Sequence, residues 1–123
     1  MRPLNLLHVL MVLGLVGTAD RARAQDATHG AKVFANCAPC HATNADNGAG
    51  PGLGGLVGRK SGSVAGFRYS RAMKAANIVW DDKSLDSYLA APQDAVPGNT
   101  MPFSGIVDAG ERRDLIAYLE TLK

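Results

Sequence analysis

The 123-residue sequence contains no run of five or more residues that alternates between apolar and polar side chains as a half-buried strand does. It has no internal repeat and no linker-like segment, and only 6% of its residues are aromatic. It also lacks a strong excess of one charge, because 13 basic residues face 11 acidic ones for a formal net charge of +2. These absences predict one all-α domain and exclude the clustered basic footprint of a nucleic-acid-binding protein.

A long hydrophobic run is missing as well, although the first residues are apolar. Arg2 precedes a mostly apolar stretch at residues 4–16, and Ala22-Arg23-Ala24 matches the small-x-small signature of a cleavage site. The alternative, an uncleaved membrane anchor, needs about 20 apolar residues, which this stretch does not reach. We therefore expect residues 1–24 to be a cleaved secretory signal peptide that directs the protein to the periplasm, with residues 25–123 as a single domain.

The predicted mature chain carries almost no net charge. Residues 25–123 contain ten basic and ten acidic side chains, so the excess seen in the full sequence belongs to the signal peptide. A domain of this size buries only about 60–65% of its unfolded surface and would benefit from a covalent staple or a bound apolar cofactor. Neutrality also predicts that docking to partners depends only weakly on salt.

The apolar pattern predicts three main helices and two long loops. We expect helices at residues 26–41, 82–90 and 108–122, with Asp81 and Asp108 as N-terminal caps, and a further helical segment around Met73. Residues 42–66 are rich in glycine, and residues 93–105 contain two prolines, so both segments are predicted loops. Loops this long in a small domain need something to pack on.

The chain has only two cysteines, and they stand in Cys37-Ala38-Pro39-Cys40-His41. The pattern C-x-x-C-H is the attachment signature of a c-type haem. On a helical turn the two thiols at i and i+3 face one side, where they can add to the two vinyl groups at one edge of a porphyrin. His41 follows directly, which brings its imidazole to the iron.

Two cysteines at this spacing have three other known uses. An exported domain could join them in a structural disulfide, and Cys-x-Pro-Cys also occurs in thioredoxin-like redox proteins, although these need a βαβ frame that the sequence does not offer. Zinc would require four ligands, which Cys37, Cys40, His41 and His29 could supply, but His29 is better interpreted as an exposed residue at a helix start. The following histidine, the export signal and the loop-rich α domain favour haem.

A haem iron held by His41 needs a second axial ligand. Met101 lies in a loop restricted by Pro97 and Pro102, whereas Met73 lies in a charged segment. A buried methionine is most often core filler, yet the predicted mature chain offers no other strong candidate. We expect Met101 to bind the iron, which raises the reduction potential relative to bis-histidine ligation and leaves no open position for a substrate.

At this point the chain resembles soluble class I cytochromes c of the mitochondrial and α-proteobacterial type. The resemblance covers nearly all of residues 26–123 and rests on the following matches: GAKVF at 30–34, CAPCH at 37–41, GPGLGGLVGR at 50–59, FRYS at 67–70, Trp80, YL at 88–89, PGNTM at 97–101 and DLIAYL at 114–119. It implies a small all-α fold of short helices and long loops wrapped around one covalent haem.

The resemblance also implies roles for individual side chains. The carbonyl of Pro51 would accept the ring N–H of His41. Arg59, Tyr69 and Trp80 would bond or shield the haem propionates, and Tyr88 would lie beside the sulfur of Met101. Two further implications concern packing: Gly30 and Phe34 would place the first helix against the last, and Phe103 would cover the haem edge.

The sequence departs from this family at two places. Met73 stands where mitochondrial members carry an asparagine near the haem. Mitochondrial members also surround the exposed haem edge with lysines, and the matching positions here are mostly uncharged or acidic: Asn36, Gln93, Asp94, Thr100, Val107 and Asp108. Steering towards an acidic partner should therefore be weak at this edge.

These observations predict a periplasmic electron carrier rather than an enzyme. We expect a monomer that exchanges one electron at a time with membrane or periplasmic redox complexes and that neither binds nucleic acid nor inserts stably into the membrane. A quinol-oxidising bc-type complex, a terminal oxidase, a photosynthetic reaction centre and a periplasmic dehydrogenase all stay open as partners. The alternatives are a thiol–disulfide oxidoreductase using Cys37 and Cys40, or a haem peroxidase if Met101 does not bind.

Overall fold

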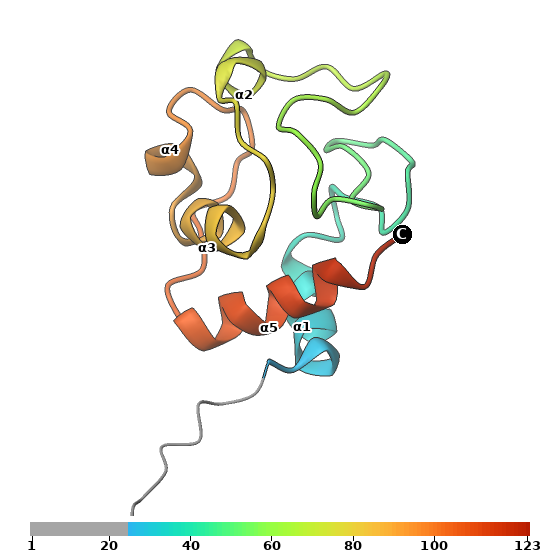
Figure 1. The fold of residues 1–123 in the computed structure, drawn as a ribbon, viewed down its shortest axis with the longest axis vertical. Helices are drawn as coiled ribbons and strands as arrows, with labels where there is room; N and C mark the ends of the chain where they lie inside the picture. Colours follow the sequence, from blue (N-terminus) through green and yellow to red (C-terminus); the bar gives the residue numbers. More distant parts are fainter. Residues whose placement is uncertain (1–24) are drawn as a thin grey trace, which may run out of the picture.

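Short helices joined by long loops make up the part of the chain that the computed structural model describes, residues 25–123 (Figure 1). The elements are α1 (Ala27–Val33), the 3₁₀ turn η1 (Phe34–Asn36), α2 (Arg71–Ala75), α3 (Asp82–Ala90), α4 (Pro92–Ala95) and α5 (Ala109–Glu120). Within these residues the only strand-like pairing is an isolated antiparallel bridge between Lys60 and Val79. The predicted all-α class is therefore confirmed. The predicted signal peptide, residues 1–24, lies outside the described residues.

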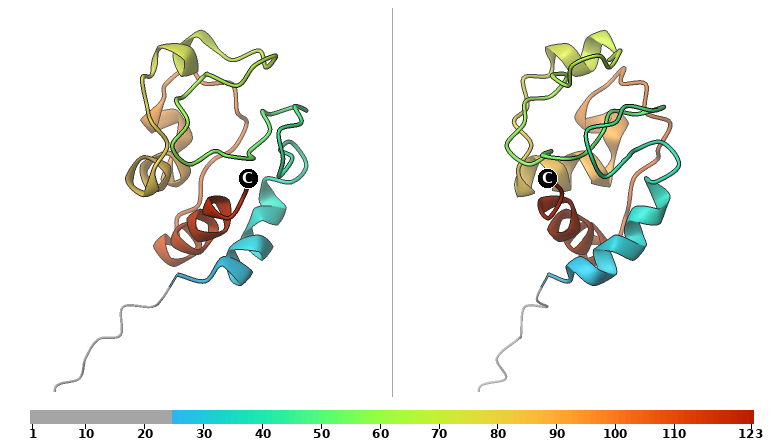
Figure 2. Two further views of the ribbon diagram at one scale, coloured as in Figure 1. Left: turned by 45° about the vertical axis from the view of Figure 1, so that its right-hand side comes forward. Right: turned by 90° about the vertical axis from the view of Figure 1, so that its right-hand side faces the viewer.

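The two ends of the described chain pack against each other. Helices α1 and α5 form the most extensive helix–helix contact and lie side by side in every view (Figures 1 and 2). Gly30 makes this contact close, because a Cβ atom there would lie 2.6 Å from the carbonyl carbon of Asp114 and 2.9 Å from Cβ of Tyr118. The rings of Phe34 and Tyr118 then meet at a centroid distance of 5.3 Å. The packing that the resemblance implied for Gly30 and Phe34 is present.

The core lies between α5, α3 and the loops that face them. Leu115 is completely buried, and Ile116 and Leu119 complete the apolar side of α5. Leu85 and Leu89 of α3 join the same cluster. Burial of these side chains supplies most of the driving force for folding. Among residues 25–123, no helix combines the length and the apolar character needed to cross a bilayer.

Helix α3 begins and ends where its sequence predicts. The Asp81 carboxylate accepts the Ser84 N–H at 2.8 Å, and the Ser84 hydroxyl accepts the Asp81 N–H at 2.9 Å, so both bonds of a capping box are present. The residues that follow were predicted as loop, and that prediction is wrong for the first of them. Pro92 starts the short helix α4, because its fixed φ suits the first position of a helix, where the missing N–H costs nothing.

Candidate functional site

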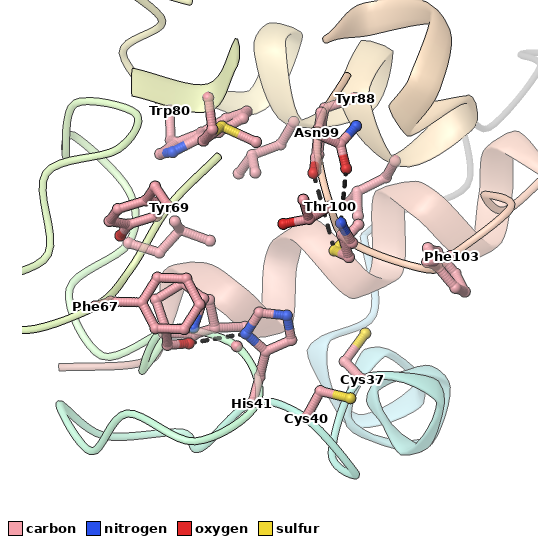
Figure 3. A pocket seen from close by; sticks show the side chains of 18 of the residues that line it. Cys37, Cys40, His41, Phe67, Tyr69, Trp80, Tyr88, Asn99, Thr100 and Phe103 are labelled. Atoms are coloured by element: carbon pink, nitrogen blue, oxygen red, sulfur yellow. Dashed lines mark hydrogen bonds between the residues drawn. The ribbon is translucent and has the colours of Figure 1, made fainter. Parts of the chain in front are cut away.

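An apolar cavity of about 450 Å³ lies beneath the loops, and it is bounded by residues from most of the described chain. Its size falls within the roughly 300–1,000 Å³ typical of cofactor sites. All nine residues predicted from the sequence to form the site line it: Cys37, Cys40, His41, Pro51, Arg59, Tyr69, Trp80, Tyr88 and Met101. Figure 3 shows His41 and the two cysteines on one side, with Asn99 and Thr100 across the cavity from them.

The two cysteines lie on a turn rather than on the long helix predicted for residues 26–41. Helix α1 ends at Val33 and tightens into η1, after which Cys40 and His41 both donate their N–H groups to the carbonyl of Cys37, at 3.1 and 3.0 Å. Because this turn keeps an i, i+3 relation, the thiols still share one side of the chain (Figure 3). Both cysteines are free thiols, with Cys37 half-buried and Cys40 exposed.

The environment of the thiols argues against disulfide-exchange chemistry. Burial raises the pKa of the Cys37 thiol, and the neighbouring Cys40 raises it further. A thiol–disulfide oxidoreductase requires the opposite, a thiolate stabilised by positive charge or a helix N-terminus. Among the described residues the βαβ frame is absent, and the Cys37 thiol is not activated, so the structure disfavours this alternative.

One ring nitrogen of His41 is hydrogen-bonded within the protein, and the other is free to bind a metal. Its Nδ1 lies 2.8 Å from the carbonyl oxygen of Pro51. A carbonyl can only accept, so Nδ1 carries the proton and Nε2 keeps its lone pair, which is the tautomer a metal needs. Gly50 sets the orientation of the ring, because a Cβ there would lie 2.7 Å from Nδ1 and 2.8 Å from Nε2. Sequence reasoning missed this role, and the only available signal was a glycine next to the proline that matches the family pattern.

His29 takes no part in the cavity. Its Nδ1 lies 2.9 Å from the Asp114 carboxylate on α5, and its backbone N–H donates to the Asp26 carboxylate at 3.0 Å. His29 therefore helps to tie the start of α1 to α5. Within residues 25–123, no cluster of three or more histidine, cysteine or acidic side chains could hold a metal ion, which removes the zinc alternative.

A buried asparagine shapes the loop that carries Met101. The Asn99 side-chain oxygen accepts the N–H of Met101 at 2.9 Å, and its amide donates to the carbonyls of Pro92 and Val96, both at 2.9 Å. Asn99 is only 7% exposed. These bonds join α4 to the Met101 loop and fix the backbone from which the sulfur projects. Sequence reasoning missed this residue too, since a single asparagine in a proline- and glycine-rich loop gives no distinctive pattern.

Tyr88 and Trp80 form the wall behind Met101. The Tyr88 hydroxyl lies 3.9 Å from the Met101 sulfur, which it can reach as a donor. Burial raises the pKa of Tyr88 to about 12, so the hydroxyl keeps its proton at any physiological pH. The Trp80 ring packs on Tyr88 with centroids 5.1 Å apart and is itself buried. This wall therefore carries no charge, and its polar groups are the Tyr88 hydroxyl and the Trp80 indole N–H.

Arg59 and Tyr69 bond to the loops that surround the cavity. The Arg59 guanidinium donates to the carbonyls of Gly52 and Gly54, at 3.1 and 3.2 Å. Burial lowers the pKa of Arg59, and the nearby Tyr69 partly offsets that effect. The Tyr69 hydroxyl accepts the N–H of Val64 at 3.1 Å. Both side chains thus hold the glycine-rich segment closed, and their contact with haem propionates stays a prediction.

Met73 also lines the cavity. Its N–H donates to the Ser70 hydroxyl at 3.0 Å, which caps α2, and its half-buried side chain packs against the core.

The six positions that match the lysines of mitochondrial members are all exposed, and two of them line the cavity: Asn36 and Thr100. The other four do not line it, and among them Val107 is 94% exposed.

Comparison with known proteins identifies the family. The family model described as cytochrome c matches residues 27–123. The chain belongs to the cytochrome c family. It is 45% identical to cytochrome c from Chlamydomonas reinhardtii over 85% of this chain and 96% of that protein, and 48% identical to cytochrome c2 from Rhodoplanes tepidamans over 77% and 91%. The solved structure of cytochrome cH from Methylobacterium extorquens matches with a TM-score of 0.76 and 44% identity, covering 78% of this chain and 98% of that one.

Cytochromes c are electron-transfer proteins that carry one covalent c-type haem, and the residues of this cavity fit that group. Two free thiols share one side of a turn, the lone pair of His41 Nε2 is uncommitted, and Met101 lines the same space. The remaining lining is predominantly apolar, as a porphyrin face requires. This protein is therefore an electron carrier with a c-type haem rather than an enzyme.

Proposed function

We propose that this cytochrome c is a periplasmic electron carrier in which His41 and Met101 are the two axial ligands of the haem iron. The observation that carries the proposal is the shared cavity, which a histidine with a free Nε2 and a methionine sulfur enter from different loops. Cys37 and Cys40 would hold the haem through two thioether bonds. When bound, the haem supplies a one-electron iron couple.

The residues of the chain contribute orientation and exclusion of water. Pro51 and Gly50 hold the His41 ring from two sides, and Asn99 fixes the backbone of Met101. Tyr88 directs its uncharged hydroxyl at the Met101 sulfur. It would therefore favour one position of the sulfur without adding a charge to the cavity. Because each of these groups is already bonded within the protein, a change of one charge in the cavity requires little rearrangement, which favours fast electron exchange.

The location and the partners are part of this proposal. A signal peptide at residues 1–24 would deliver the chain to the periplasm, where thioether attachment keeps the haem from being lost. The partners would be membrane or periplasmic redox complexes, with a quinol-oxidising bc-type complex, a terminal oxidase, a photosynthetic reaction centre and a periplasmic dehydrogenase as candidates. Isolating the protein from a periplasmic fraction with Gln25 as its first residue would test the location.

A pair of methionine variants tests the ligand assignment. We expect Met101→Ala to abolish the weak near-infrared sulfur-to-iron band of the ferric protein, because it removes the proposed ligand. Met73→Ala is the matched control, since Met73 lines the same cavity, and we expect it to retain the band. Loss of the band in the Met73 variant would refute the assignment, whereas a purified protein without covalent haem in its visible spectrum would refute the cofactor itself.

A further inference from the structure

The peptide group that orients His41 is itself held by a side chain from outside the cavity. His41 Nδ1 donates to the carbonyl of Pro51 at 2.8 Å, the bond drawn as a dashed line from its ring in Figure 3. That carbonyl and the N–H of Gly52 belong to one planar peptide group, so neither can turn without the other. The N–H of Gly52 donates to Oδ1 of Asn47 at 3.2 Å. A continuous chain of hydrogen bonds therefore runs from Asn47 through this peptide group to His41.

The N–H of Gly52 differs from those of its neighbours in what it is bonded to. Gly50, Leu53 and Gly54 donate their N–H groups to backbone carbonyls. Gly52 is buried and donates to the side chain of Asn47 instead. The position of this one peptide group therefore depends on a side chain that a substitution can change.

The side-chain amide of Asn47 has one orientation that satisfies both of its partners. Its Nδ2 donates to the carbonyl of Ala65 at 3.0 Å. A carbonyl only accepts and a backbone N–H only donates, so exchanging the oxygen and the nitrogen of the amide would break both bonds. The oxygen of Asn47 is therefore the atom that faces Gly52.

Asn47 acts on the cavity without forming part of its lining. The residue is exposed and does not line the cavity, so its effect has to pass through the peptide group of Pro51 and Gly52. Gly52 permits the close approach that this requires. A Cβ there would lie 2.5 Å from the carbonyl oxygen of Asn44 and 2.8 Å from that of Asp46, so the segment that leads into Asn47 lies directly against it.

We propose that Asn47 is a positioning residue for electron transfer, which strengthens the bond from His41 to Pro51 and thereby lowers the reduction potential of the haem. The proposal rests on the axial role proposed above for His41 and adds a residue that tunes it. Hydrogen bonds in a chain polarise one another, so an acceptor on the Gly52 N–H makes the Pro51 carbonyl a stronger acceptor. A stronger bond at Nδ1 raises the basicity of Nε2, which favours ferric iron over ferrous iron.

A purely structural role for Asn47 predicts the opposite change in potential. Its bond to Ala65 joins two loops, and loss of that bond would loosen them. A looser loop admits water, which stabilises the more highly charged ferric state and lowers the potential. Loss of the hydrogen-bond chain to His41 raises the potential instead. The sign of the change therefore separates the two roles.

Two substitutions of nearly the same shape as asparagine test the chain. Asn47→Leu removes the acceptor and fills its space, whereas Asn47→Asp keeps an acceptor and gives it a charge. Both lose the bond to Ala65, so both should unfold at lower guanidinium chloride concentration than the unaltered protein. We expect Asn47→Leu to favour reduction about threefold, which is about 28 mV because tenfold is about 59 mV for a one-electron couple. Asn47→Asp should lower the potential.

Asn44 supplies matched controls on the same loop. Its side chain bonds to Asp46, accepting the backbone N–H at 2.9 Å and donating to the carboxylate at 3.1 Å, and it has no bond to the Pro51–Gly52 peptide group. We expect Asn44→Leu to change the reduction equilibrium by less than about 1.5-fold, because its amide is not joined to His41. Asn44→Asp measures the effect of an added charge on this loop, which should be smaller than the effect of Asn47→Asp.

The bond made by His41 can also be observed directly. The Nδ1 proton of His41 should give a separate NMR signal in the ferrous haem-loaded protein, and a stronger hydrogen bond moves such a signal downfield. We expect an upfield shift in Asn47→Leu and a downfield shift in Asn47→Asp. The Asn44 variants should leave the signal in place. Loosening of the loops alone would not move the signal in opposite directions in two variants that both lose the Ala65 bond.

A lowered or unchanged potential in Asn47→Leu would overturn the proposal, as would an equal rise in Asn44→Leu. An Nδ1 proton signal that does not move in either Asn47 variant would overturn it as well. In each of these cases the carrier function stands if the variants keep a reversible one-electron couple and the near-infrared band. Absence of a covalent haem spectrum from the unaltered protein would refute the carrier function, and the role of Asn47 would fall with it.

Discussion

Replacing Gly30 by alanine tests how tightly the two terminal helices are joined. Alanine favours helix by about 1 kcal/mol over glycine, so in an exposed helix the change would stabilise. Here the new Cβ would lie 2.6 Å from the carbonyl carbon of Asp114 and 2.9 Å from Cβ of Tyr118. Ordinary contacts between carbon atoms lie near 3.5–4.0 Å, so α1 has to move away by about 1 Å.

The cost of that movement exceeds the helix-forming gain. A gap of 0.5–1 Å forfeits roughly a quarter to a half of the dispersion energy across an interface, and overpacking of a close contact costs typically about 1–3 kcal/mol. The ring contact between Phe34 and Tyr118, 5.3 Å between centroids, lies at the same contact and contributes about 0.5–1.5 kcal/mol more. We expect Gly30→Ala to lower the free energy of unfolding by about 2–3 kcal/mol.

The assay is unfolding in guanidinium chloride, followed by circular dichroism on the haem-loaded protein. The transition midpoint should fall while its slope stays the same, because the surface exposed on unfolding does not change. Gly48→Ala is the control, since its Cβ would make only an ordinary contact, 3.5 Å from the carbonyl oxygen of Cys40. We expect that variant to change stability by less than about 0.5 kcal/mol. If Gly30→Ala proves as stable as Gly48→Ala, α1 and α5 are less tightly packed than the Gly30 contact implies.

Three further variants test other contacts. Asn99→Ala removes three buried bonds to backbone and should lower the free energy of unfolding by about 2–3 kcal/mol, with a weakened near-infrared band as a second readout. Gly50→Ala should displace the His41 ring and shift the reduction potential, whereas Gly48→Ala should not, because its Cβ would meet a backbone atom only at 3.5 Å. Hydrogen bonds from Ser84 in the first turn of α3 lower the pKa of Asp81. The Asp81 carboxylate therefore adds to the free energy of unfolding above the ordinary pKa of 3.8, and this contribution is lost as pH falls through the lowered pKa. Asp81→Asn should remove that pH dependence from the unfolding midpoint.

Sequence reasoning predicts well the features that depend on local chemistry. Cys37, Cys40 and His41 were found from their spacing, and Asp81 was found as a cap because one side-chain oxygen suffices to start a helix. The end of α3 before Pro92 follows from the same kind of local rule. These predictions need no knowledge of what lies elsewhere in the chain.

Features that depend on contacts between distant parts of the chain could not be predicted from the sequence. The first helix was predicted to run through His41, but it ends at Val33 and the cysteines lie on a turn that the cavity needs. Asn99 and Gly50 matter because of the atoms that fold onto them, and no spacing in the sequence reports those neighbours.

The contact between α1 and α5 also bears on how the protein is made. Synthesis delivers the N-terminal part of the chain first, so α1 and the Cys37–Cys40 turn that follows it appear before the helix on which α1 packs. Closing so distant a pair is slow compared with forming a local turn. Before α5 docks, the two thiols would lie on a segment without its packing partner and would be accessible for haem attachment. Docking of the last helix then closes the cavity around its contents, so the order of the elements along the chain also sets the order of assembly.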